Sequence, residues 1–350
     1  MSNKWFDVIR TAVALAVTLV LTLIIIFLVS EEPLYALKLF LTGPMDSFRH
    51  IGNIFEMAIP LVFTGLGLSI IFQSSQFNIS ASGAFVIGAV ATTLSAIFLP
   101  IGGIVGTLIS LLIGGVVGAC FSLIPGILKV KWDTSELVTS LMLNYVLYSL
   151  GSYIINNYVR DVNAGGMVSV KFQESIILPR LVNGTRVHYG LIIAIIAIIA
   201  SYYFLYRTKW GYEIRMTGLN SEFAKYSGIT IAKAALLAQL VGGLLAGLGG
   251  SVETLGMYRR YQWQVVPSFG FDGIIVAIMA KNNPAYVPVA AVFLAYLRIG
   301  ADIMSRSADV PSEVITIIQA VVIMLLVAES FLSKWRYKRV VKATMSNKEA

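Results

Sequence analysis

The amino-acid sequence predicts an all-α protein that crosses a membrane about ten times, and three observations support this fold class. First, 57% of the 350 residues are hydrophobic and only 13% are charged, whereas soluble domains contain about 25% charged residues. Second, residues 57–128 contain no Asp, Glu, Lys or Arg, and because about 20 apolar residues span a bilayer, this stretch must cross it roughly three times. Third, the apolar runs are continuous, which is typical of helices and excludes a β-barrel.

The chain divides into ten predicted membrane-spanning helices, and no segment between them is long enough to form a soluble domain. We therefore treat residues 1–350 as one transmembrane domain. An even number of spans places both termini on the same side of the membrane. The predicted spans cover residues 8–29, 51–72, 79–99, 101–124, 136–157, 188–207, 231–253, 268–281, 285–304 and 311–332.

The distribution of Lys and Arg predicts that both termini face the cytoplasm. With that orientation, 16 of the 26 basic residues lie on the cytoplasmic side, as the positive-inside rule requires. The net charge of +8 is then mainly a topology signal, because the basic residues are dispersed over loops, and nucleic-acid binding is not expected. The basic tail, residues 334–350, is expected to lie against anionic lipid headgroups.

Motifs for catalysis or metal binding are absent from the sequence. It has no phosphate-binding Gly-x-x-x-x-Gly-Lys loop and no Gly-x-Ser-x-Gly elbow. The two histidines, His50 and His188, are far apart, and Cys120 is the single cysteine, so neither a His/Cys metal centre nor an internal disulfide is expected. The sequence therefore predicts no catalytic residue, no metal site and no cofactor in this chain, and any energy must come from a partner.

Two polar, glycine-rich breaks interrupt the apolar pattern. The first, residues 73–80, lies inside the uncharged stretch and predicts either a re-entrant broken helix or an ordinary tight cytoplasmic turn. The second follows a glycine-rich span and includes residues 258–264 and 267–273. Because Phe77-Asn78 and Phe271-Asp272 occupy comparable places in the two breaks, which face opposite sides, they suggest an inverted repeat.

A few polar or ionisable residues in or near the spans are candidates for a solute path, because a charge at membrane depth is costly unless it faces a cavity or a partner. Glu56 and Glu253 lie near predicted span ends, where their side chains can reach the interface, and we rank them lower. The remaining candidates are Asn78, Asn144, Asp272 and Arg298.

The cytoplasmic loop at residues 208–230 predicts a short amphipathic helix outside the bilayer. Asn220 or Ser221 can cap its first turn, and Gly228 can end it. Leu219, Phe223 and Tyr226 then share one apolar face. Such a face either docks into a groove of another protein or lies flat on the membrane.

The same loop, with its aromatic-glycine turn followed by Gly-x-Asn, Ala-x-Tyr and Gly-Ile, resembles the coupling segment of ABC importer permeases for branched-chain amino acids, simple sugars and nucleosides. The resemblance extends from about the second to the ninth span. Its Met-Leu-Asn-Tyr and Gly-Phe-Asp-Gly-Ile motifs are most similar to the nucleoside-uptake branch. Ser80 and Ser82 depart from this pattern, where the family often has Gly and an acidic residue. The other matching segments are residues 77–79, 141–145, 245–250 and 270–274.

The resemblance implies a permease subunit in the cytoplasmic membrane that forms the path for nucleosides. It also implies two cytoplasmic subunits that bind ATP and Mg²⁺, a second and non-identical permease, and an external solute-binding protein. The alternatives are a sugar or branched-chain amino-acid permease, or, from another class, an ion-coupled secondary transporter. The resemblance assigns contact with the ATPase to Gly218, Asn220, Phe223, Tyr226 and Gly228.

Overall fold

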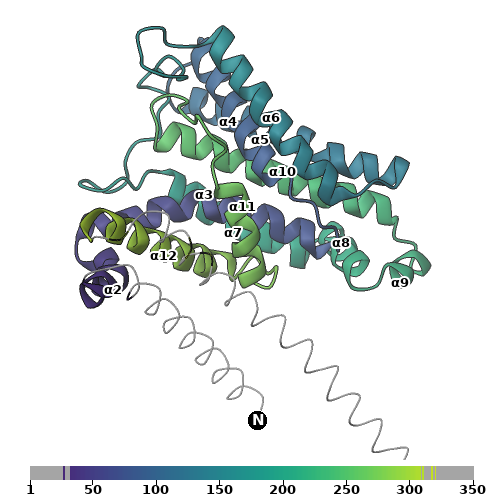
Figure 1. Cartoon of the computed structure of the whole chain (residues 1–350). Helices are drawn as coiled ribbons and strands as arrows, with labels where there is room; N and C mark the ends of the chain where they lie inside the picture. Colours follow the sequence, from purple (N-terminus) through teal and green to yellow (C-terminus); the bar gives the residue numbers. More distant parts are fainter. Residues whose placement is uncertain (1–26, 28–31, 309, 311–316, 318–319, 321–350) are drawn as a thin grey trace, which may run out of the picture. The chain divides into compact units, whose positions relative to one another are not determined.

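The computed structural model describes residues 32–308 and the isolated residues 27, 310, 317 and 320 (Figure 1). Within this part of the chain the regular secondary structure is helical, apart from two isolated β-bridges in the segment after α6. The elements in order are α2 (Pro33–Thr42), η1 (Gly43–Met45), α3 (Phe48–Gln73), α4 (Ala81–Phe98), α5 (Gly103–Trp132), α6 (Glu136–Tyr158), α7 (Gly190–Arg207), α8 (Lys209–Leu219), α9 (Ser221–Tyr226), α10 (Ile231–Gly256), α11 (Phe269–Met279) and α12 (Val287–Ser307).

Seven of these helices, α3 to α7, α10 and α12, are long and apolar enough to cross a membrane. Each coincides with one of the predicted spans, so the all-α polytopic fold class is confirmed. The predicted spans at residues 8–29 and 311–332 and the basic tail at 334–350 lie outside the described residues.

The predicted span at residues 268–281 is wrong in length. The structure has only the 11-residue helix α11 there, which at 1.5 Å per residue extends about 16 Å, roughly half of a bilayer core. Residues 257–268, which precede it, are not helical. The apolar pattern predicts a helix that crosses the whole bilayer, because hydrophobicity alone does not distinguish a half-length helix from one that spans it.

The chain forms two compact units, residues 51–295 and the two flanking segments, with boundaries inside α3 and α12. In the flanking unit, α2 packs against α12 through a small apolar cluster, and the hydroxyl of Tyr296 donates a hydrogen bond to the carbonyl oxygen of Leu41. The cluster consists of Ala36, Phe40, Ala301, Met304 and Val310.

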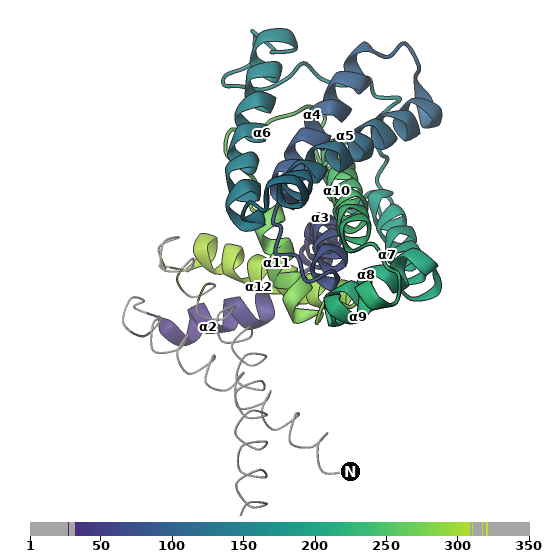
Figure 2. The ribbon, with the colours of Figure 1, turned by 90° about the vertical axis from the view of Figure 1, so that its right-hand side faces the viewer.

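The larger unit is built on close contacts among α3, α4, α5 and α10 (Figure 2). Glycines make these contacts possible, because a β-carbon built on Gly67 of α3 would lie 2.5 Å from the carbonyl oxygen of Gly242 of α10. On another face of α10, a β-carbon on Gly247 would lie 2.6 Å from the carbonyl oxygen of Gly114 in α5. Small residues at helix contacts let backbones approach closely in membranes, so the glycine-rich pattern of α10 has a packing role.

At each end of this unit, segments that connect the helices contact each other, and the pairs in contact agree with the predicted topology. Leu178, in the long segment after α6, donates its N–H to the carbonyl oxygen of Leu255 at the end of α10. At the opposite end, the Gln73 side chain donates to the carbonyl oxygen of Asn282, which follows α11. Segments predicted to share a side of the membrane therefore contact each other.

We predict that replacing Gly247 with Val will destabilise the helix packing by about 3 kcal/mol or more, because the contacting atoms belong to backbone and cannot rotate away. The measurement is the thermal unfolding midpoint of the detergent-purified protein. The control is Gly165→Val, because a β-carbon at Gly165 has no heavy atom within 4 Å. Equal midpoints for the two variants would contradict this packing role.

Candidate functional site: two helix breaks and the segment that contacts them

The first break connects the end of α3 to the start of α4, and Asn144 of α6 holds its backbone in place. The Asn144 amide nitrogen donates to the carbonyl oxygen of Ile79 at 2.9 Å, and its amide oxygen accepts from the N–H of Gly83 at 2.8 Å. Asn144 is 2% exposed. Because a buried backbone group without a partner is costly in a membrane, this single side chain permits the non-helical backbone at this depth.

Other side chains attach the same break to its surroundings. The side-chain oxygen of Asn78 accepts a hydrogen bond from the N–H of Ser80, and the hydroxyl of Ser80 bonds to that of Ser122 in α5. The N–H of Ile79 donates to the hydroxyl of Ser140 in α6. The break is therefore fastened to α4, α5 and α6 rather than standing free as a surface turn.

The second break brings the N-terminus of α11 against the N-terminus of α4. A β-carbon on Gly270 would overlap the backbone of Ser82, so the two helix starts are in direct contact. The hydroxyl of Thr64 in α3 donates to the carbonyl oxygen of Phe269 at 2.9 Å. Thr64 lies nine residues before the end of α3, about 14 Å along the helix, or roughly half of a bilayer core.

The junction of these two helix starts has the chemistry of a site for a polar solute. Helix N-termini carry partial positive charge and free N–H groups, which favour oxygen atoms of a ligand. The hydroxyl of Ser82 is buried and has no hydrogen-bond partner among the described residues. Asp272, in the first turn of α11, is 4% exposed.

An aromatic cluster lies next to the same junction. The ring of Phe85 in α4 is 5.4 Å from that of Trp263 and 5.6 Å from that of Phe269. Tyr261 packs edge-on against Trp263 at 5.4 Å. Trp263 and Tyr261 belong to the non-helical segment before α11, so these rings cover the junction from the side of that segment.

The loop at residues 208–230 forms two helices, α8 and α9, of which only the second was predicted. Asn220 caps α9 as expected, because its side-chain oxygen accepts from the N–H of Phe223 at 3.0 Å. Gly228 follows α9 with a φ of +79°, the left-handed conformation that ends many helices. Leu219, predicted to share the apolar face, instead ends α8, whereas Phe223 and Tyr226 lie on α9. All three side chains are exposed, by 79%, 51% and 88%.

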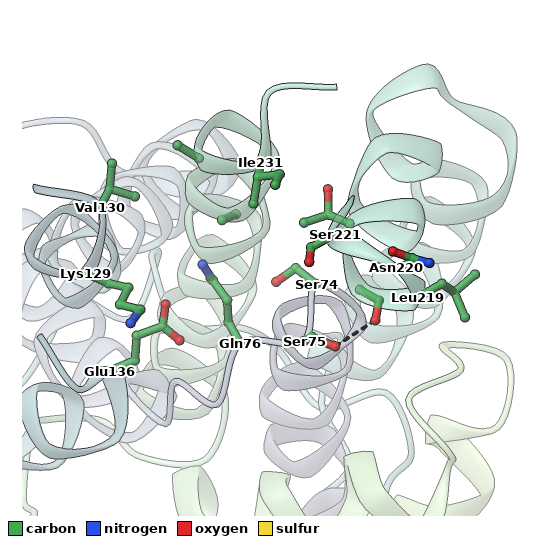
Figure 3. Close-up of a pocket in the computed structure, with 14 residues that line it drawn as sticks. Ser74, Ser75, Gln76, Lys129, Val130, Glu136, Leu219, Asn220, Ser221 and Ile231 are labelled. Atoms are coloured by element: carbon green, nitrogen blue, oxygen red, sulfur yellow. Dashed lines mark hydrogen bonds between the residues drawn. The ribbon is translucent and has the colours of Figure 1, made fainter. Parts of the chain in front are cut away.

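Direct contact joins this loop to the first break. A β-carbon on Gly218 would overlap the carbonyl oxygen of Gln73, and the hydroxyl of Ser75 donates to the Gly218 carbonyl oxygen at 2.8 Å. Figure 3 shows this bond at the edge of a cavity of about 710 Å³, which is also lined by Lys129 and Glu136. A displacement of α8 and α9 must therefore act on the segment that leads into α4.

Comparison with known proteins places these features in a family. The model of the family described as branched-chain amino acid transport system / permease component matches residues 50–328. The chain belongs to this permease family. The resemblance predicted from the sequence is thus confirmed, and the chain is a transport component and not an enzyme.

Three curated relatives are similar along most of the permease. The glucose ABC transporter permease protein TsgB13 of Haloferax volcanii is 29% identical, covering 87% of this chain and 83% of the relative. The guanosine ABC transporter permease protein NupP of Bacillus subtilis is 28% identical, with 83% and 84% covered. The nucleoside ABC transporter permease protein NupB of Lactococcus lactis subsp. cremoris is also 28% identical, with 100% and 99% covered.

The structure brings together some of the residues selected from the sequence. Asn78 and Asn144 lie at the first break, and Asp272 lies two residues after Gly270, which touches the start of α4. Arg298 belongs to the flanking unit of the permease, so it is not placed with the other three. Sequence reasoning missed Thr64, Ser75 and Ser82, and these small hydroxyl residues gave no signal beyond lying in or near a polar break.

We predict that Asn144→Leu will lower the free energy of unfolding by about 2–5 kcal/mol, because it leaves one buried N–H and one buried carbonyl oxygen without a partner. Asn157→Leu, at the exposed end of the same helix, is the control, since its exposed side chain bonds to the Tyr153 carbonyl oxygen one turn earlier in the same helix. The check is the thermal midpoint of the purified permease. A similar midpoint for both variants would show that the break does not depend on Asn144.

Proposed function

We propose that this chain is the membrane-spanning subunit of an ATP-driven ABC importer and forms part of the path for nucleosides. The observation that carries the proposal is the contact of Gly218 and Ser75, which links α8, the helix directly before the exposed α9, to the first break. Through this contact, movement imposed on α9 from outside the bilayer reaches the junction of α4 and α11. The solute path follows that junction, and the residues assigned to the path are Asn78, Asn144 and Asp272. Arg298 remains a candidate from the sequence alone.

Nucleosides are the proposed solutes for two reasons. The guanosine permease of Bacillus subtilis and the nucleoside permease of Lactococcus lactis match most of the chain. The junction offers hydroxyls and helix N-termini beside the rings of Phe85 and Trp263, which suits a solute with a polar sugar and a flat base. Glucose is the second candidate, because the glucose permease of Haloferax volcanii is equally similar.

The partners follow from the exposed surfaces and the relatives. Cytoplasmic subunits that bind ATP and Mg²⁺ would take the apolar face of α9 into a groove, and an external solute-binding protein would deliver the solute. A second, non-identical permease is supported by the relatives, because two nucleoside permeases of Lactococcus lactis and two guanosine permeases of Bacillus subtilis each match this chain. Both termini would then face the cytoplasm, with the α9 end of the bundle on that side.

We expect Phe223→Asp and Tyr226→Asp each to abolish co-purification of the ATPase and to reduce ATP-dependent uptake at least tenfold, because a buried carboxylate would replace an apolar contact. Val162→Asp is the matched control, since Val162 is 83% exposed in the segment after α6. Retained assembly and uptake in the α9 variants would refute the coupling role and favour a helix that lies on the membrane.

The solute assignment is tested by uptake of radiolabelled guanosine, uridine, glucose and leucine into cells that express the complete transporter. We expect guanosine and uridine to accumulate and unlabelled nucleosides, but not glucose, to compete. Accumulation of glucose alone would identify a sugar permease, and accumulation of leucine alone would identify a branched-chain amino-acid permease. Uptake that persists without the ATPase but responds to an ion gradient would indicate a secondary transporter.

A further inference from the structure

Two acidic side chains are buried in the larger unit at the end of α3 and α10 away from α9. Glu56 is 9% exposed and Glu253 is 1% exposed. Their position near the ends of predicted spans suggested that they reach the interface, but the structure buries both. Neither takes part in the proposed coupling or in the junction of α4 and α11.

The register of α3 and α10 places these two carboxyl groups opposite each other. The helices run antiparallel, with Gly67 against Gly242 and Phe63 against Gly249. Eleven residues make just over three helical turns, so Glu56 lies on the same face of α3 as Gly67, and Glu253 on the same face of α10 as Gly242. Since Gly67 and Gly242 touch, the register brings the two acids to the same level about 16 Å further along, and Glu56 acts electrostatically on Glu253.

Within the described residues, one cation acts on this pair, and its side chain is exposed. Arg186 acts on Glu56 from the segment after α6. Tyr258 is the other titratable group that senses both carboxyls, and its burial raises its pKa to about 12, so it is neutral. His188 packs against Gly256, one turn beyond Glu253, and burial lowers its pKa to about 4, so it is neutral as well.

The hydrogen bonds of the two acids also favour an added proton. One carboxyl oxygen of Glu253, Oε2, is buried without a hydrogen-bond partner among the described residues. On α3, Pro60 has no N–H to donate to the carbonyl of Glu56, four residues earlier, which adds an acceptor at this level. Two carboxylates and this carbonyl are all acceptors, so the pair itself supplies no hydrogen-bond donor while both acids are ionised.

We propose that Glu56 and Glu253 bind one proton between them and form an acid–carboxylate pair. One carboxylate takes up a proton from a hydronium ion of the solvent, which is left as water, and its new O–H group donates a hydrogen bond to the other carboxylate; no other covalent bond changes. The remaining negative charge is the one on which Arg186 acts from the segment after α6. A buried, uncompensated charge costs several kcal/mol, so the proton removes the main penalty for placing two acids here.

A basic hollow of about 840 Å³ lies beside the α10 end of this pair. Arg186, Tyr258 and Gly256 belong to its lining, and Gly256 follows Glu253 by three residues. Two of the other cations are engaged elsewhere, because Arg259 pairs with Glu174 and Arg260 with Asp161. The other two cations that line the hollow, Lys171 and Arg180, are exposed to solvent, where water screens their charge.

The test is infrared spectroscopy of the full-length chain, purified with the subunits that accompany it, at neutral pH in H₂O and in D₂O. We expect the carbonyl stretching band of one protonated carboxyl per chain, shifted in D₂O. Glu253→Gln and Glu56→Gln should each remove it, because the remaining carboxyl then pairs with Arg186 and ionises. Glu174→Gln, which changes an exposed carboxyl of the outer segment, should leave the band intact.

Three outcomes would overturn the proposal: no such band in the wild-type protein, an intact band in both Gln variants of the pair, or a band equivalent to two protonated carboxyls. If the Gln variants fail to fold, the wild-type band decides the matter, since its deuterium shift and its intensity per chain need no variant. The measurement does not depend on transport, so its result is separate from that of the uptake and co-purification experiments.

Discussion

The rest of the structure depends on one constraint, namely that backbone groups at membrane depth need partners within the protein. Helices meet this need for most of the chain. Where the chain leaves the helix between α3 and α4, the amide of Asn144 meets it by bonding to Ile79 and Gly83 at once. The non-helical backbone there can exist because a neutral side chain with both a donor and an acceptor was placed on the neighbouring helix.

The proposed coupling would act on a bundle that combines a rigid core with one segment held less tightly. The glycine contacts of α10 with α3 and α5 leave no space for movement between these helices. The first break, by contrast, is held by individual hydrogen bonds and touches α8 through Gly218. A force applied at α9 would therefore act on a rigid helix core and on this segment. The segment is the part that can move, because it can change its hydrogen bonds.

Much of the fold could be predicted from the sequence, because hydrophobic length determines where helices cross a membrane. All seven spans in the described residues were predicted, and the cap at Asn220 and the helix end before Gly228 followed from local rules. The half-length of α11 could not be predicted, since it depends on Thr64 and Ser82 meeting the start of that helix. The contact of Ser75 with Gly218 was missed for a similar reason, as it joins residues 143 positions apart. The burial of Glu56 and Glu253 depends on the register of two helices, which composition does not reveal.

The glycine contacts also bear on how this scaffold can acquire different specificities. At Gly67, Gly242 and Gly247 any side chain would collide with backbone, so these positions offer almost no room for variation. The rings beside the junction, those of Phe85, Trp263 and Phe269, are larger side chains that contact one another rather than helix backbone. Relatives named for glucose and for guanosine are compatible with such a division, in which one part of the sequence preserves the architecture and another is free to diverge.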